Sequence, residues 1–252
     1  MVKVHAVSFP TYQVAARVVE SALSRGRLDI LRWLFAYRQS IGSCTTDAMD
    51  NAAGNGHLEV VNWLHENRTE GCTTRAINLA SMNGHLEVVQ WLHVNRQEGC
   101  SNRAVDGAAS NGFLEVVKWL LENRSEGCST SAMDGAAGNG HLHVVKWLHE
   151  NRAEGCTGDA FRLAARNGHL PVILWLLEHK TGYCSKGDLY RAVGTSHFDV
   201  ALLCFERHPS EPTFPSYLSR SFTWAFSDWL YSYHAPEVAL PILERFRKVL
   251  TR

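Results

Sequence analysis

The sequence contains no apolar run of about 18 residues and no excess of charge of either sign. Its 252 residues include 25 lysines and arginines and 25 aspartates and glutamates, so the formal net charge is +0. Without the apolar run, an ordinary transmembrane helix is excluded. Because the charges balance, no global field draws the chain to nucleic acid or to an anionic membrane.

The beginning of the sequence also lacks a feature of secreted proteins. The stretch MVKVHAVSFPTYQ has no continuous apolar segment of the kind that forms the centre of a signal peptide. We therefore expect an intracellular protein, either cytoplasmic or nuclear.

What the sequence contains instead is one unit that recurs every 28 residues. Its cysteines keep this spacing without a slip at Cys44, Cys72, Cys100, Cys128, Cys156 and Cys184. The tryptophans from Trp63 to Trp175 and the Asn-Gly pairs from Asn55 to Asn167 follow the same period. A period between about 20 and 50 residues indicates an array of small structural units, each too small to bury its apolar side alone.

The seven cysteines do not predict a disulfide framework. Their number is odd, which leaves at least one unpaired. Equivalent positions in stacked helical units lie about 8–10 Å apart, whereas a disulfide needs Cα atoms within about 7 Å. We expect buried, reduced cysteines with a structural role.

Each unit predicts a pair of helices. In the unit that begins at Cys44, small apolar residues recur at helical spacing: Ala48, Met49, Ala52 and Ala53. Thr45 or Thr46 can serve as the N-cap of this first helix. Asn-Gly is also a hairpin signal, but its flanks have helical spacing, so Gly56 is predicted as the left-handed residue after the helix. The second half, HLEVVNWLHENR, predicts a second helix with one broad apolar face.

The motif AA-x-NGHLEVV-x-WL resembles the ankyrin repeat, although Asp47-Ala48-Met49-Asp50 stands where that family has Thr-Pro-Leu-His. The period is about five residues shorter than in that family. The resemblance therefore implies an all-α, ankyrin-like solenoid of stacked helix-turn-helix repeats with reduced or absent β-hairpin fingers. The run from Trp63 to Thr73 further resembles the large ankyrin-repeat families of oomycetes.

The array is predicted to occupy residues 1–208. A divergent repeat spans 14–43, regular repeats begin at residues 44, 72, 100, 128 and 156, and a degraded repeat spans 184–208. Residues 209–252 are predicted to be a proline-marked linker followed by an aromatic-rich helical cap. The alternative is that this last segment docks a partner.

Comparison of the repeats argues against a catalytic or metal-binding role for the histidines. We call the equivalent positions of all repeats a column. The column of His57 holds Phe113 in one repeat, and the column of His65 holds Leu121 and Leu177 in two others. A position that accepts Phe or Leu is a packing position. No CxxC, HExxH, GxSxG, Walker or GxGxxG motif is present. The sequence predicts no catalytic residue, no metal site and no cofactor.

Two further sets of polar residues have structural interpretations. The Arg-x-Glu pairs, such as Arg68 and Glu70, predict an exposed charge ladder in which each pair contributes about 0–1 kcal/mol. Asp50, Asn78, Asp106 and Asp134 occupy the position of the family histidine, and we expect them to bond to neighbouring backbone.

Candidate binding residues are those that differ between otherwise identical repeats. The resemblance implies that residues beside the first helix of each repeat face a concave groove, although drift at exposed positions would also produce such variation. The candidates are Arg75, Leu79, Met82, Arg103, Ser110, Asp159, Leu163 and Arg166. Arg and Met are favoured at interfaces, so Arg75, Met82 and Arg103 lead this set.

The resemblance implies a monomeric, non-enzymatic scaffold or adaptor that binds a protein partner through this groove. An alternative is a targeting adaptor whose C-terminal aromatic segment recruits a second protein. Binding to nucleic acid or to a membrane is not predicted.

Overall fold

The structure is a computed structural model that describes residues 13–37, 45–179, 181, 185–207, 220–233, 239, 242 and 244. It divides into two compact units, Met1–Ser129 and Thr130–Arg252. The first unit contains α1 (Gln13–Ser24), α2 (Leu28–Tyr37), α3 (Thr46–Gly54), α4 (Leu58–Asn67), α5 (Thr74–Met82), α6 (Leu86–Asn95), α7 (Arg103–Ser110) and α8 (Leu114–Asn123). The second contains α9 (Thr130–Gly138), α10 (Leu142–Asn151), α11 (Gly158–Arg166), α12 (Leu170–Glu178), α13 (Lys186–Gly194), α14 (Phe198–Arg207) and α15 (Arg220–Tyr233).

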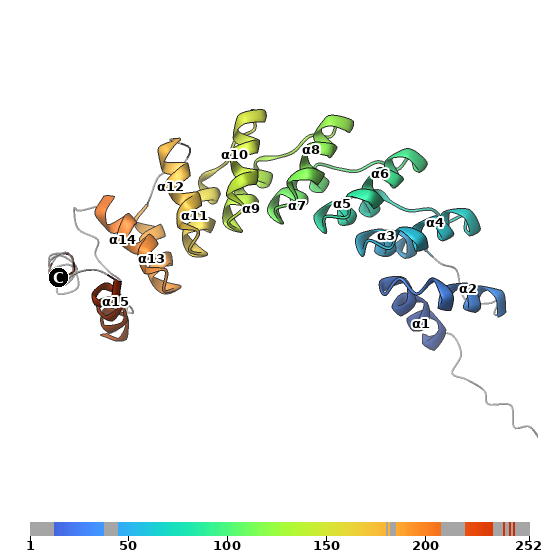
Figure 1. Cartoon of the computed structure of the whole chain (residues 1–252), viewed down its shortest axis with the longest axis horizontal. Helices are drawn as coiled ribbons and strands as arrows, with labels where there is room; N and C mark the ends of the chain where they lie inside the picture. Colours follow the sequence, from blue (N-terminus) through green and yellow to red (C-terminus); the bar gives the residue numbers. More distant parts are fainter. Residues whose placement is uncertain are drawn as a thin grey trace, which may run out of the picture. The chain divides into compact units, whose positions relative to one another are not determined.

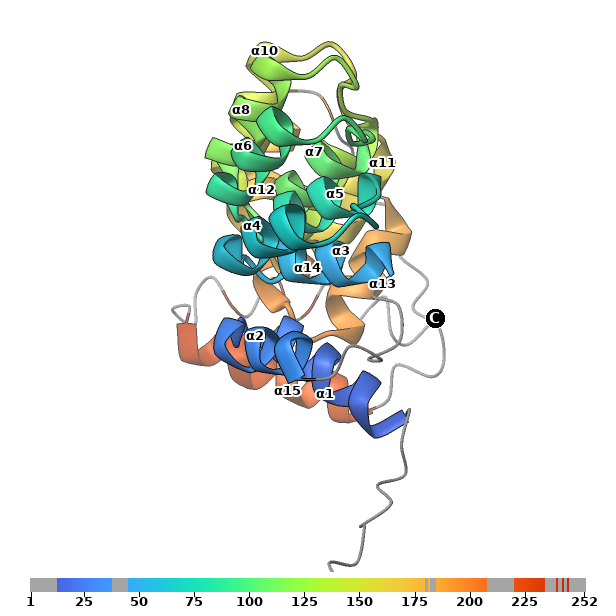
Figure 2. The ribbon, with the colours of Figure 1, turned by 90° about the vertical axis from the view of Figure 1, so that its right-hand side faces the viewer.

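Helices of successive repeats pack side by side in two layers. In the first unit α5 packs between α3 and α7, and each of these first helices contacts its own second helix. Figure 2 shows α3, α5 and α7 in one layer and α4, α6 and α8 in the other. In the second unit α11 packs against both α9 and α13, and α10 packs against α12 (Figure 1). The prediction of an all-α stack of helix pairs is confirmed, and the described connections between repeats contain no strand.

Small and β-branched apolar residues form the core between the layers. Ala52 and Ala53 of α3 and Val61 of α4 are fully buried, and their counterparts in the following repeats are buried as well. Alanine leaves room for the backbones of neighbouring first helices to approach closely, while Val and Leu of the second helices fill the space between layers. The short first helices therefore owe their stability to packing more than to their length.

The ends of the first helices follow the predicted signals. The hydroxyl of Thr45 accepts a hydrogen bond from the backbone N–H of Asp47, and Thr73 and Thr157 cap α5 and α11 in the same way. After α3, Gly56 has φ = +77°, as predicted from the Asn-Gly pair. A side chain at this glycine would also meet the ring of His85 from the next repeat, whose Nδ1 would lie 2.5 Å from the added Cβ.

Polar side chains connect each repeat to the next. Asp50 accepts hydrogen bonds from the backbone N–H of Thr73 at 2.8 Å and from its hydroxyl at 2.6 Å. Corresponding bonds join Asn78 to Ser101, Asp106 to Ser129, and Asp134 to Thr157. The expected backbone bonds are thus present, and those to Thr73 and Thr157 hold the N-caps of α5 and α11.

The asparagines of the Asn-Gly pairs make a second series of connections. The amide of Asn83 donates to the carbonyl of Gly54, the last residue of α3, at 2.6 Å. Asn111 donates in the same way to Met82, and Asn167 to Gly138. The helices α5, α7 and α11 are therefore each tied to the preceding repeat at both of their ends.

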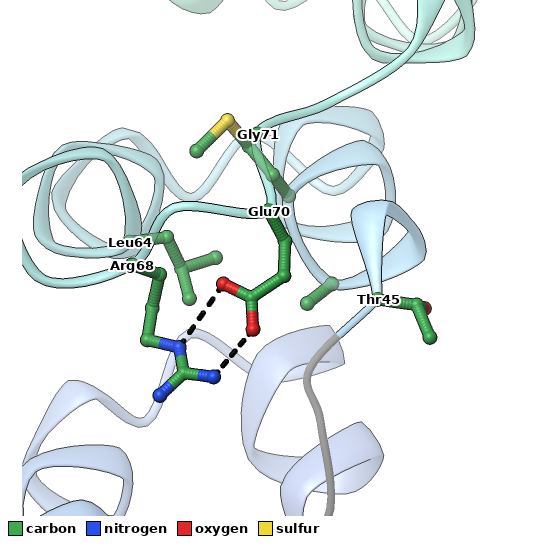
Figure 3. Close-up of a pocket in the computed structure, with 7 residues that line it drawn as sticks. Thr45, Leu64, Arg68, Glu70 and Gly71 are labelled. Atoms are coloured by element: carbon green, nitrogen blue, oxygen red, sulfur yellow. Dashed lines mark hydrogen bonds and ion pairs between the residues drawn. The ribbon is translucent and has the colours of Figure 1, made fainter.

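The Arg-x-Glu pairs are not the exposed ladder that the sequence suggested. The side chains of Arg96 and Glu98 are only 23% and 27% exposed, and two hydrogen bonds join them. Arg96 also lies 3.4 Å from Nδ1 of His65 in the preceding repeat. The equivalent Arg68 and Glu70 line a small hollow with Leu64, as Figure 3 shows. The prediction of exposed pairs was wrong because the loop folds back over the junction between repeats.

The histidine, tryptophan and cysteine columns serve packing. The ring of His65 meets Trp91 of the next repeat edge to face at a centroid distance of 5.3 Å, and His93 meets Trp119 at 5.2 Å. Burial raises the pKa of the thiols of Cys72 and Cys100 to about 11. These thiols stay protonated at neutral pH and are poor nucleophiles. Cys72 is buried as predicted, whereas Cys100, Cys128 and Cys156 are only half-buried. Cys44 and Cys184 lie outside the described residues.

The described part of the C-terminal segment packs against α14. Phe226 and Leu230 of α15 are buried, and the rings of Phe226 and Trp229 each lie 5.7 Å from that of Phe198. The predicted linker at 209–219 lies outside the described residues. The division at residue 209 and the capping role of 209–252 therefore stay predictions.

One buried residue departs from the alanine column and provides a test of the core. Ser81 is fully buried, and its hydroxyl has no hydrogen-bond partner among the described residues. The other regular repeats carry Ala53, Ala109, Ala137 and Ala165 here. Because an unsatisfied buried hydroxyl costs about 1–3 kcal/mol, we expect Ser81→Ala to raise the free energy of unfolding by about 1 kcal/mol in urea denaturation. The reverse change, Ala109→Ser, should lower it; a stability loss in Ser81→Ala would contradict this account of the hydroxyl.

The half-buried ion pairs predict how stability depends on pH. Hydrogen bonds from Arg96 lower the pKa of Glu98 from 4.5 to about 2, and Arg124 lowers that of Glu126 in the same way. A carboxyl whose pKa is depressed by folding stabilises the protein above its unfolded pKa and loses that contribution as pH falls. We therefore expect the urea midpoint to fall between about pH 5 and pH 2. Glu98→Gln should lower stability at pH 7 and flatten this decline, whereas exposed Glu122→Gln should leave it unchanged.

Candidate functional site

The structure places five of the candidate residues on two neighbouring helices of the first unit. Arg75 and Arg103 lie at the N-terminal ends of α5 and α7, and Met82 and Ser110 are the last residues of the same helices. Leu79 lies within α5. We call the exposed ends of α5 and α7 the first-helix face. Asp159, Leu163 and Arg166 lie on α11 of the second unit and are considered separately.

The N-terminal end of the first-helix face carries a net positive charge. Arg75 forms an ion pair with Asp47, with Nη1 and Oδ1 2.7 Å apart and both side chains more than half exposed. Arg103 is exposed and forms no ion pair with any carboxylate that the structure describes. One exposed guanidinium at this end is thus neutralised and the other is not.

The C-terminal end of the same face presents two large apolar side chains. Met82 is 37% exposed, and its side chain lies over Gly107 of α7. Phe113, at the start of the next second helix, is also 37% exposed, and its ring lies over Gly84. Asn111 connects the two turns by donating to the carbonyl of Met82 at 2.8 Å. Two large exposed apolar side chains therefore flank one junction between repeats.

Phe113 was missed as a candidate by reasoning from the sequence. In the sequence, Phe113 only indicates that its column is a packing position. The available signal was that Phe113 replaces a histidine found in the other regular repeats: His57, His85, His141 and His169. The exposed edge of a histidine ring is less apolar than that of a phenyl ring. Phenylalanine at residue 113 therefore makes the protein surface more apolar there and keeps the packing role of the column.

Leu79 and Leu163 have a packing explanation for their difference from other repeats. Each lies against a glycine at the end of the preceding first helix: a Cβ on Gly54 would lie 2.9 Å from Cβ of Leu79, and one on Gly138 would lie 2.8 Å from Cβ of Leu163. At the next junction the sizes are exchanged, because Met82 lies against Gly107. Large and small residues thus alternate across these junctions.

In the second unit the three candidates do not form a comparable cluster. Asp159 forms an ion pair with Arg162 of the same helix at 2.8 Å. Leu163 is half-buried against Gly138, and Arg166 is exposed at the end of α11. The combination of an unpaired guanidinium and an exposed apolar pair is a property of the first unit.

The described residues contain no cluster of three or more His, Cys, Asp or Glu side chains that could hold a metal ion. None of the described helices is long and apolar enough to cross a membrane. The first-helix face thus has a charged end and an end with two exposed apolar side chains.

Comparison with known proteins finds ankyrin repeats along most of the chain. A family model of ankyrin repeats in three copies matches residues 49–134 and 105–187, and a model of ankyrin repeats in many copies matches residues 19–65. Among 90 matching chains of solved structures is the crystal structure of the human ASB11 ankyrin repeat domain. It is 20% identical with a TM-score of 0.54, over 74% of this chain and 96% of that chain. No curated protein matches the sequence.

The alternation of large and small residues predicts opposite effects of one substitution at two equivalent glycines. Alanine is favoured over glycine in a helix by about 1 kcal/mol, but at Gly54 the new methyl group would meet Cβ of Leu79. We expect Gly54→Ala to lower the free energy of unfolding by about 1–2 kcal/mol, the usual range for overpacking. Gly194 occupies the same column with no atom within 4 Å of an added Cβ.

Gly194→Ala should therefore be neutral or stabilising in the same denaturation experiment. In a Leu79→Gly background, Gly54→Ala should cost less than it does in the otherwise unchanged chain, because the Cβ that the new methyl group meets is gone. Equal effects of alanine at residues 54 and 194 would show that the contact with Leu79 does not limit the residue at 54.

Proposed function

Because the chain belongs to the ankyrin-repeat family, whose repeats are generally protein–protein interaction modules, we propose that it binds a protein partner through the first-helix face. It acts as a scaffold or adaptor and not as an enzyme. Its repeats provide a rigid frame, and the residues that differ between repeats provide the recognition.

The observation that carries this proposal is the separation of residues into two classes. Residues that recur in most repeats are engaged in packing or in bonds between repeats: Asp50, which recurs at 106 and 134, bonds Thr73, and Asn83, which recurs in all regular repeats, donates to a backbone carbonyl. Arg103 and Met82 vary between repeats and keep exposed side chains. Exposed Arg and Met are residue types that are favoured at protein interfaces.

Other features support a protein partner in a reducing compartment. The balance of acidic and basic residues does not favour nucleic acid. The thiols of Cys72, Cys100 and Cys156 are free and have raised pKa values because of burial. Unpaired, unreactive cysteines at this density are typical of intracellular proteins. We propose that the protein is a monomer in the cytoplasm or nucleus.

The test compares two triple variants by proximity labelling and pull-down from cells that express the protein. Arg75/Met82/Arg103→Ala removes the exposed side chains of the first-helix face. Partners specific to this face should be recovered at least about tenfold less well, the effect of losing about 1.4 kcal/mol of binding energy.

The matched control, Glu66/Val94/Glu122→Ala, changes three exposed side chains at equivalent positions of the second helices. It should recover the same partners as the wild type. Both variants must show the denaturation midpoint expected of a folded array. If the two variants recover the same partners equally well, the binding surface does not include the first-helix face.

A further inference from the structure

Building on the proposed function, we infer that the first-helix face recognises a peptide segment that carries a carboxylate and a large apolar side chain a few residues apart. The carboxylate binds at the N-terminal ends of α5 and α7, beside Arg75 and Arg103. The apolar side chain binds at their C-terminal end, against Met82 and Phe113.

The charge at the N-terminal end favours an acidic group. Asp47 pairs with Arg75 at 2.7 Å and leaves the guanidinium of Arg103 as the second exposed cation, with no described carboxylate in an ion pair with it. A guanidinium presents a planar fork of donors that matches a carboxylate with two parallel hydrogen bonds. A partner carboxylate would therefore complete an arrangement of two cations and two anions.

The residue at 113 indicates that the apolar end serves recognition. Elsewhere in its column a histidine packs over the preceding glycine and can bond to a backbone carbonyl, as His57 does with the carbonyl of Ser24 at 2.9 Å. Phe113 lies over Gly84 in the same way but cannot form that bond. Histidine at this position already satisfies the packing, and the phenyl ring adds exposed apolar surface at the junction that Met82 also occupies.

The lengths of the helices set the spacing of the two groups on the partner. Seven residues separate Arg75 from Met82 along α5, a rise of about 10 Å. An extended chain advances about 3.3 Å per residue. The carboxylate and the apolar side chain are therefore expected within four residues of each other in an extended segment.

Displayed peptides provide the probe. A phage library of random peptides of about 12 residues is selected on the immobilised full-length protein. Acidic residues and Leu, Met, Phe or Trp should be enriched together, within four positions. Two single variants then separate the ends of the site, and each takes a residue already present in its column: Arg103→Ser, as at Ser131, and Phe113→His, as at His141.

Both variants should fold, because sister repeats carry the same residues, and equal denaturation midpoints check this. Selection on Arg103→Ser should lose the enrichment of acidic residues and keep that of apolar residues. Selection on Phe113→His should do the reverse. Recovery of the peptides enriched on the wild type should fall about tenfold on either variant.

The failure of this inference differs from the failure of the proposed function. If the selected peptides lose binding to Arg75/Met82/Arg103→Ala but show no paired acidic and apolar residues, the inference is wrong and the proposed binding face stands. If the selected peptides bind that triple variant as well as the wild type, the proposed binding face is contradicted. If no peptide is enriched above an uncoated surface, the inference of a peptide ligand is wrong, and the pull-down decides the proposed function.

Discussion

Every helix pair in this protein depends on contact with the next one. In the pairs from α3 to α14, a first helix of eight or nine residues and a second helix of nine or ten present one apolar side that neither can bury alone. The alanines at the ends of α3 and α5 make close contact between first helices possible, and the second helices then cover the remaining apolar surface. Stability of such an array is a sum over junctions, so the junction is the unit that the sequence must specify.

The polar residues of the repeat are organised around the same junction. The carboxylate of Asp50 holds the N-cap of α5, and the amide of Asn83 holds the carbonyl of Gly54 at the end of α3. Arg96 combines an ion pair within its own loop with a contact to His65 of the preceding repeat. Most of the constant side chains thus act between repeats, which leaves few positions free to serve recognition.

Much of this architecture could be predicted from the sequence because equivalent positions of the repeats can be compared with one another. Comparison of columns identified the histidines as packing residues, and the Asn-Gly spacing predicted the left-handed turn at Gly56. A hydrogen bond between Asp50 and neighbouring backbone was predicted, but its partner, Thr73 of the next repeat, was not. The half-buried position of Arg96 and Glu98 was missed, because two charged residues in a loop look exposed until the path of the loop is known.

The candidate binding residues were harder to predict for a related reason. Variation between repeats shows that a position differs but not whether packing or binding is the reason. Leu79 and Met82 therefore appeared equivalent in the sequence. The structure separates them: Leu79 is half-buried against Gly54, whereas Met82 stays exposed while it covers Gly107. Phe113 was overlooked because its packing is the same as that of a histidine, and only its exposed edge differs.

The exchange of large and small residues between neighbouring helices has a consequence for how this gene can change. Near-identical 28-residue copies invite unequal recombination, which adds or removes whole repeats. A duplicated copy of residues 72–99 would set Met82 against a second Leu79, and a deleted one would set Gly54 against Gly107. Either product would have a poorly packed junction, so the order and number of repeats are constrained although the copies look interchangeable.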